Sequence, residues 1–236
     1  MKSVRFVPLL PLLGWLASCS SVPLEYYGAD IPDSLNLYVG FSLQDLDEIE
    51  MSLEYSDNPP DIITSTSGRV DVNLGAPYRF VEGRINAGLG LGTIYSKDLE
   101  GEPKGEYYFL QMDGRVLMRA GYSFSDFTHV SAGIFADGGM GILWSKPLWD
   151  LAGIWQLESS YLLVSPGVQL LLGIGSPERI TLINSFNLWN FYEVELRVVP
   201  LRRVPLILAI KAAFRDMDLG SFPPLFVAAG VGWRFW

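Results

Sequence analysis

Residues 81–95 read VEGRINAGLGLGTIY, and apolar residues alternate with polar or small ones through most of this stretch. One parity holds Val81, Ile85, Ala87, Leu89, Leu91 and Tyr95. The other parity holds Glu82, Arg84, Asn86, Gly88, Gly90 and Gly92. Successive side chains of a β-strand point to opposite faces, so the alternation predicts a strand with one apolar and one polar face. The stretch exceeds the usual strand of about five or six residues, and a tilted strand that crosses a membrane needs about 9–11.

The same period of two recurs along most of the chain. It is clearest in residues 35–43, 49–55, 70–74, 106–122, 130–134, 192–198, 206–214 and 227–235. A soluble β-sandwich also alternates, with its apolar side turned inward. Two features favour a membrane barrel: the polar faces are rich in Gly, Ala and Ser, and aromatic residues gather near the ends of the segments, as in the girdles of such barrels. These aromatic residues are Tyr95, Tyr107, Tyr108, Tyr122, Phe124, Trp144, Trp149, Trp155, Trp189, Phe191, Tyr192, Trp233 and Trp236.

Composition excludes several classes of protein. The chain is 49% hydrophobic and 13% aromatic but only 18% charged, whereas disordered chains have few aromatic residues and high charge. Its single cysteine excludes a disulfide scaffold. A formal net charge of −9 indicates that nucleic acid is not a partner.

The N-terminus has the pattern of an export signal. Lys2 and Arg5 precede an apolar run over residues 6–17, which is too short to span a bilayer. The run closes on Leu16-Ala17-Ser18-Cys19, which resembles the lipobox of bacterial lipoproteins and implies lipidation of Cys19. The alternatives are an ordinary cleavable signal with an incidental cysteine, or an uncleaved helix. We therefore expect a signal peptide over 1–18, a tether over 19–34 and a barrel over 35–236.

The mature chain resembles a small bacterial outer-membrane β-barrel over about 200 residues, although no specific family is recognised. Residues Val227–Trp236 alternate and end on aromatic residues, like the C-terminal signal by which such barrels are recognised for assembly, with Trp236 one residue beyond the alternation. The resemblance implies an outer-membrane location with both termini periplasmic. It also implies outer-membrane lipids and the barrel assembly machinery as partners, with porin-like passage of small solutes as one possible role.

We predict an all-β fold, a single antiparallel transmembrane β-barrel of about ten strands within a range of 8–12. Eleven amphipathic segments can be read, but single-chain barrels have even counts. The segments near Leu35 and Ile49 share a parity, so they could form one bent strand, which gives ten; a missed strand would give twelve. Short breaks at residues 75–77, 123–126, 175–178 and 200–204 are expected on the periplasmic side, and longer polar links at 56–66, 97–105, 145–153 and 216–224 on the other.

Charged residues of both signs fall on the polar parity and are expected to face the lumen. The predicted lumen charge network comprises Arg69, Arg84, Arg115, Arg119, Glu193, Glu195, Arg197, Lys211 and Arg215. Asp71, Glu82, Asp113 and Arg234 are expected on the same side. Charges in so narrow a tube should pair, because an unpaired buried charge is costly. The network could be a salt-bridged plug that rigidifies the barrel, or a lining that selects small polar or anionic solutes.

His129, the only histidine, and Ser131 lie on one face of a predicted strand. The pair faintly resembles the His-x-Ser element of outer-membrane lipid A deacylases, but Ala132 stands where those enzymes have an asparagine. Asp137 is the nearest acid for a catalytic triad. We expect a non-enzymatic envelope barrel without cofactor or metal site. The alternatives are a lipid-modifying enzyme that uses His129 and Ser131, and a lipid-tethered soluble β-sandwich that binds a surface ligand.

Overall fold

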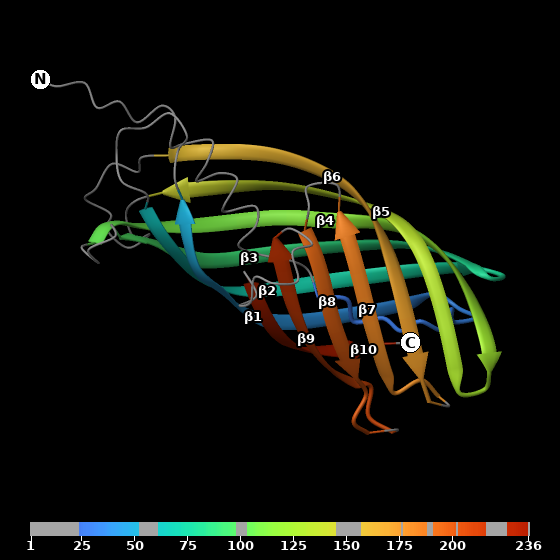
Figure 1. The fold of residues 1–236 in the computed structure, drawn as a ribbon. Helices are drawn as coiled ribbons and strands as arrows, with labels where there is room; N and C mark the ends of the chain where they lie inside the picture. The colour runs from blue at the N-terminus through green and yellow to red at the C-terminus, as the bar shows by residue number, and fades with distance from the viewer. Residues whose placement is uncertain are drawn as a thin grey trace, which may run out of the picture.

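The computed structural model describes residues 24–51, 61–97, 103–144, 157–175, 177–187, 191–201, 203–215 and 226–235. These residues form ten strands (Figure 1). The strands are β1 (Asn36–Met51), β2 (Asp61–Tyr78), β3 (Val81–Lys97), β4 (Pro103–Ser125), β5 (Thr128–Trp144), β6 (Leu157–Ile174), β7 (Ile180–Asn187), β8 (Phe191–Val198), β9 (Leu206–Arg215) and β10 (Phe226–Arg234). In the part of the chain that the structure describes, no helix is long and apolar enough to cross a membrane.

The ten strands form one closed antiparallel barrel. Each strand pairs with its neighbours in sequence, and β1 pairs with β10, from Tyr38 opposite Arg234 to Leu46 opposite Phe226. Closure removes both free edges of the sheet, which is the arrangement that lets a β-structure sit in a membrane without unpaired backbone groups. The predicted all-β transmembrane barrel of ten strands is therefore confirmed.

One bent strand resolves the question of the eleventh segment. The segments that begin near Leu35 and Ile49 both belong to β1, whose pairing with β2 shifts register between Leu46 and Ile49. A register shift of this kind adds residues to one strand, bends it and increases its local twist. Strand β6 continues without a break through Pro166. Pro166 pairs only with β5, since the pairing of β6 with β7 begins at Gly167.

The first short turn differs from the sequence prediction. Gly75, Ala76 and Pro77 were expected to form it, but they continue β2 and pair with β3. The chain reverses instead at Arg79 and Phe80, where Arg79 has φ 59°. Because proline is tolerated near a strand end, β2 continues through Pro77. The turn therefore lies a few residues after the Gly-Ala-Pro sequence that predicted it.

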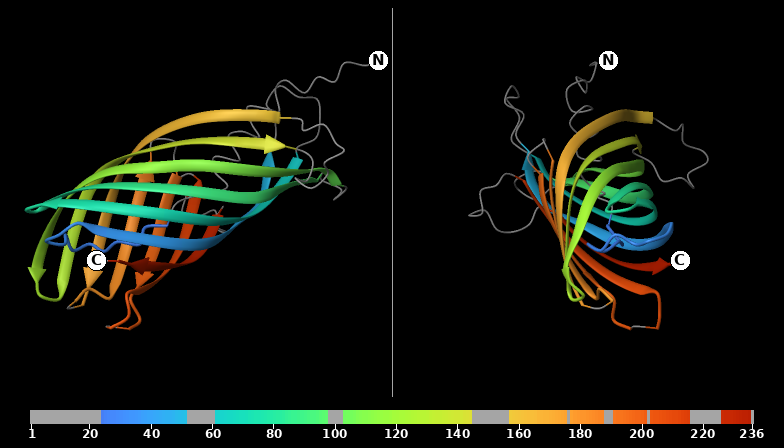
Figure 2. Two further views of the ribbon diagram at one scale, coloured as in Figure 1. Left: turned by 180° about the vertical axis from the view of Figure 1, so that it is seen from behind. Right: turned by 90° about the vertical axis from the view of Figure 1, so that its right-hand side faces the viewer.

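The wall of the barrel is much taller on one side than on the other (Figures 1 and 2). Strands β1–β6 have 16 to 23 residues and form what we call the tall wall. Strands β7–β10 have 8 to 10 residues and form the short wall. The turns after β2, β4, β6 and β8 lie at one end, here the short-turn end. The connections after β1, β3, β5, β7 and β9 lie at the other, here the long-loop end.

The polarity of a soluble protein is inverted in this barrel. Outward-facing residues such as Phe41, Ile85, Met118 and Ile134 are apolar and more than half exposed. Exposed aromatic residues ring the short-turn end: Tyr78, Phe80, Tyr122, Phe124, Phe127 and Phe235. Contiguous apolar surface on this scale is compatible with water only when something covers it, and aromatic belts sit at membrane–water interfaces. The outer wall therefore has the character of a lipid-facing surface. Of the aromatic residues predicted to form girdles, Trp149, Trp155, Trp189 and Trp236 lie outside the described residues.

Candidate functional site: the lumen and its N-terminal segment

Residues 24–30 lie inside the barrel, and we call them the lumen segment. Leu24, Glu25 and Tyr26 are completely buried, and Tyr27 and Ala29 are 1% exposed. This stretch falls within residues 19–34, which the sequence predicted to be a tether. The structure instead surrounds it with inward-facing side chains of the wall.

Three glycines open a slot for Tyr26. A Cβ atom added at Gly40 on β1 or at Gly232 on β10 would collide with the ring of Tyr26, and one at Gly230 would lie 2.6 Å from its hydroxyl oxygen. The Tyr26 hydroxyl donates to the Phe41 carbonyl at 3.3 Å. The absence of a side chain at these three inward-facing positions of β1 and β10 is therefore what lets the Tyr26 ring approach the wall.

Arginines of the wall bind the backbone and the second tyrosine of the lumen segment. Arg197 Nε donates to the Tyr26 carbonyl at 2.9 Å. The guanidinium carbon of Arg84 lies 4.1 Å from the centroid of the Tyr27 ring, and that of Arg119 lies 4.9 Å from it. The Tyr27 hydroxyl donates to Gln169 Oε1 at 2.8 Å. Cations over an aromatic face are attracted to it, most strongly where water is excluded.

The segment leaves the lumen beside the β6–β7 turn. The Glu178 carboxylate accepts hydrogen bonds from the backbone N–H groups of Ala29 and Asp30 at 2.9 and 2.7 Å. Arg119 donates to the carbonyl groups of Gly28 and Asp30. The short-turn end of the lumen is thus closed by hydrogen bonds to the chain itself.

The middle of the lumen contains a cluster around Arg115. Arg115 binds Glu25 at 2.6 Å and the two carboxylate oxygens of Asp137 at 2.6 and 2.8 Å. Glu193 lies 3.5 Å from the same guanidinium and 3.3 Å from Lys211. Bidentate arginine–carboxylate pairs are among the strongest hydrogen-bonded contacts in proteins. This cluster therefore joins the lumen segment to β4, β5, β8 and β9.

Two further clusters line the inner face of β2, β3 and β4. In the first, Arg69 binds Asp71 at 2.7 Å and both carboxylate oxygens of Asp113. In the second, Glu82 accepts from Arg84 and Arg119, each at 2.7 Å. Each of these charges has a partner of opposite sign, which is the condition under which it can be kept away from water.

The predicted lumen charge network lies on the inner face wherever its side chains are described. Its buried members are Arg69, Arg84, Arg115, Arg119, Glu193, Glu195, Arg197 and Lys211. The side chain of Arg215 lies outside the described residues, as do Cys19 and the signal peptide. Arg234, expected on the same face, is exposed at the short-turn end of β10. Sequence reasoning missed the acids and tyrosines of the lumen segment, because they lie outside every alternating stretch.

His129 and Ser131 both face inward and are buried, but each has a different neighbour. Nδ1 of His129 lies 3.0 Å from Ser123 Oγ, and Ser131 Oγ accepts from Arg119 at 3.1 Å. Asp137, the acid that the sequence suggested for a triad, binds Arg115. Nucleophilic catalysis needs the nucleophile, base and orienting acid in one hydrogen-bonded series. His129, Ser131 and Asp137 instead each contact a different partner.

The fold and the lumen define a closed β-barrel with an apolar outer face and a lumen filled by charged, aromatic and aliphatic side chains. No family model and no curated protein matches the chain. The solved structures that are similar to it include the following three. The translocator domain of the autotransporter NalP from Neisseria meningitidis has a TM-score of 0.47 and 11% identity, with 95% of each chain covered. The Pseudomonas putida toluene transporter TodX has a TM-score of 0.33 and 9% identity, covering 87% of this chain and 90% of that one. Ail of Yersinia pestis, crystallised with a heparin analogue, has a TM-score of 0.31 and 7% identity, covering 85% and 97%.

Proposed function

We propose that the protein is a non-enzymatic outer-membrane β-barrel whose lumen is closed by its own N-terminal segment. The observation that carries the proposal is the ion pair between Arg115 on the wall and Glu25 in the lumen segment. It supports a structural, non-conducting barrel over an open porin-like pore, because a pore needs a water-filled path along its axis. A barrel of about eight strands is just wide enough for side chains to fill, and ten strands leave little more room.

Several features support an outer-membrane location. The outer face is apolar, and the strands of the short wall, with 8 to 10 residues, come close to the roughly 9–11 that a tilted strand needs to cross a membrane. The connections at one end are on average shorter than those at the other. Outer-membrane barrels have short periplasmic turns and longer extracellular loops. The short-turn end, where β10 ends at Arg234, is therefore proposed to be periplasmic.

Lipidation of Cys19 is part of the same proposal and rests on the lipobox resemblance. Metabolic labelling with a palmitate analogue should modify the wild-type chain and not the C19S variant. A wild-type chain that carries no label after export would remove the lipoprotein assignment and leave the barrel assignment intact.

Planar-bilayer recording tests the closed lumen. The purified full-length protein should give no steady conductance, while a variant in which residues 24–30 are replaced by a Gly/Ser sequence of equal length should conduct. Heat-modifiable gel mobility of both proteins checks that each forms a barrel. Steady conductance of the folded wild-type protein would contradict the proposal, as would a silent replacement variant that is shown to be folded.

A further inference from the structure

The lumen segment has a direction, and that direction bears on where the N-terminal end of the chain lies. This inference rests on the closed lumen proposed above. At the short-turn end, a Cβ added at Gly28 would collide with the Glu178 carboxylate of the β6–β7 turn. Four positions earlier, Leu24 lies against Gly230, halfway along β10. Followed backward from Asp30, the chain therefore climbs from the short-turn end toward the long-loop end.

The remaining chain is long enough to complete the passage. Gly230 lies four positions from Phe226, where β10 begins at the long-loop end, and a strand rises about 3.3 Å per residue, so this is about 13 Å. Cys19 lies five positions before Leu24, and an extended chain spans up to about 3.6 Å per residue, or about 18 Å. Residues 19–23 can therefore reach the rim of the short wall.

The way back to the short-turn end is already occupied. Chain that turned back at Leu24 would have to pass residues 25–30, whose surroundings contain Arg84, Arg119 and Arg197 in contact with the lumen segment. A second strand of backbone there would need hydrogen-bond partners for its own polar groups. The upward path leads away from these contacts, toward the long-loop end.

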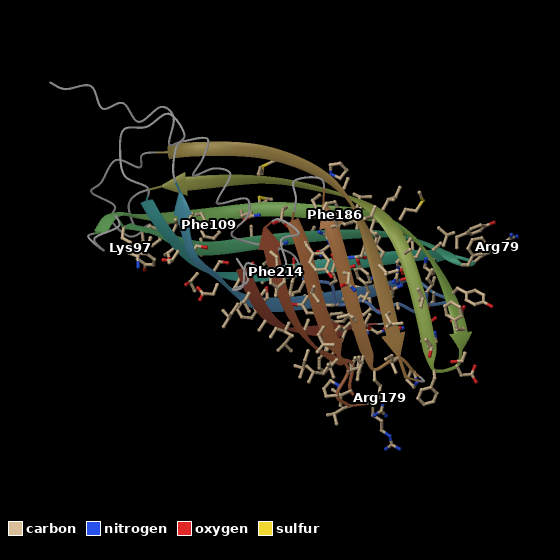
Figure 3. All side chains as sticks on the ribbon, in the orientation of Figure 1. Arg79, Lys97, Phe109, Arg179, Phe186 and Phe214 are labelled. Carbon is tan, nitrogen blue, oxygen red and sulfur yellow. The ribbon has the colours of Figure 1, made fainter. Side chains whose placement is uncertain are left out.

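The rim of the short wall lies at the height of a membrane surface. Tyr192 and Phe214 pack with ring centroids 6.4 Å apart near the long-loop ends of β8 and β9, and the Tyr192 hydroxyl donates to Asn184 at 2.7 Å. Figure 3 shows Phe186 and Phe214 at the corresponding ends of β7 and β9. Amphipathic aromatic residues favour the membrane–water boundary. With the short-turn end periplasmic, this rim meets the outer leaflet, and the tall wall continues beyond it.

We propose that the chain threads its own barrel from the short-turn end to the long-loop end and presents the residues that precede Leu24 on the outer face of the membrane. A lipid carried by Cys19 then inserts into the outer leaflet beside the short wall. The two ends of the chain lie on opposite sides of the membrane, whereas the resemblance to outer-membrane barrels alone implied that both are periplasmic.

Thiol labelling of intact cells tests the threading. The variant V22C should react with a membrane-impermeant maleimide to the same extent as D218C, which lies in the connection after β9. The matched control L201C, in the β8–β9 turn, should react only after the outer membrane has been permeabilised. The wild-type chain, with Cys19 as its single cysteine, gives the background. An epitope inserted between Ser21 and Val22 should likewise bind antibody on intact cells.

Labelling of V22C only after permeabilisation, as for L201C, would overturn the threading, and so would the absence of surface signal from both V22C and the epitope. Bilayer recording of the same proteins separates this result from the proposed function. If the barrel does not conduct but its N-terminal end is labelled only from the periplasm, the closed lumen is supported and the threading is contradicted. Steady conductance of the wild-type barrel would instead contradict the closed lumen, on which the threading rests.

Discussion

Arg115 on β4 and Glu25 in the lumen segment are ninety positions apart in sequence, and their Nη1 and Oε1 atoms are 2.6 Å apart in the structure. The same guanidinium lies 3.9 Å from the centroid of the Phe135 ring and holds Asp137 through two hydrogen bonds. One side chain therefore fastens the lumen segment to the wall while it joins β4 to β5. The position of the Arg115 guanidinium is therefore defined by β4, by β5 and by the lumen segment.

Replacing Arg115 by methionine should lower the free energy of unfolding by about 3–5 kcal/mol, because it leaves buried carboxylates without their cation. Urea unfolding in detergent micelles measures the change. The exposed Arg179 in the β6–β7 turn provides the matched control, and R179M should alter the unfolding free energy by less than about 0.5 kcal/mol. Equal effects of the two substitutions would show that the Arg115 cluster does not stabilise the barrel.

The slot around Tyr26 predicts that a side chain at Gly232 opens the lumen. In G232V, the added methyl groups occupy the position of the Tyr26 ring, so the lumen segment should leave and the protein should conduct in planar bilayers. Overpacking of this kind costs about 1–3 kcal/mol. Gly83 is the control, because an added Cβ there meets no atom within 4 Å. A silent, folded G232V protein, or a G83V protein that conducts equally, would argue against the slot.

Arg79 has a positive φ in the β2–β3 turn (Figure 3), a backbone conformation that costs a residue with a Cβ roughly 1–2 kcal/mol. Glycine adopts it without this penalty. The variant R79G should therefore be more stable than the wild type, by about 1 kcal/mol once the greater freedom of glycine in the unfolded chain is subtracted. The substitution R79A, which removes the same guanidinium but retains a Cβ, should show no gain in urea unfolding. A gain of equal size in both variants would assign the effect to charge.

His129 and Ser131 should not support lipid hydrolysis, because each contacts a different neighbour. Overproduction of the wild-type protein should leave the acyl chains of lipid A unchanged by mass spectrometry. The variants H129A and S131A should give the same spectrum. Loss of an acyl chain that depends on Ser131 would favour the deacylase-like alternative instead.

The wall of the barrel was predictable because one physical rule governs it. Period-two alternation assigns each residue to the lipid or the lumen, so the burial of Arg69 and the exposure of Ile85 follow from parity once a strand is assumed. The shared parity of the segments near Leu35 and Ile49 likewise favoured ten strands. The turn at Arg79 was less predictable, since arginine carries no turn signal while Gly75 and Pro77 do.

The lumen segment was not predictable by the same rule, because it forms no strand and its contacts are long-range. The Tyr26 ring fits against the wall only because β1 and β10 have glycines beside it. In the alternating sequence pattern these glycines are simply small residues. A signal was nevertheless present: Leu24-Glu25-Tyr26-Tyr27 is unusually rich in large side chains for a solvated linker. The unequal height of the walls also escaped prediction, since strand ends are the weakest part of a pattern analysis.

Closure between β1 and β10 also constrains the order in which the molecule is assembled. The residues inside the ring precede all of its strands in the sequence, and β10, which seals the ring, is the last of those strands. Assembly therefore has to hold residues 24–30 in place while ten strands form around them, or pull them through a ring that has already formed.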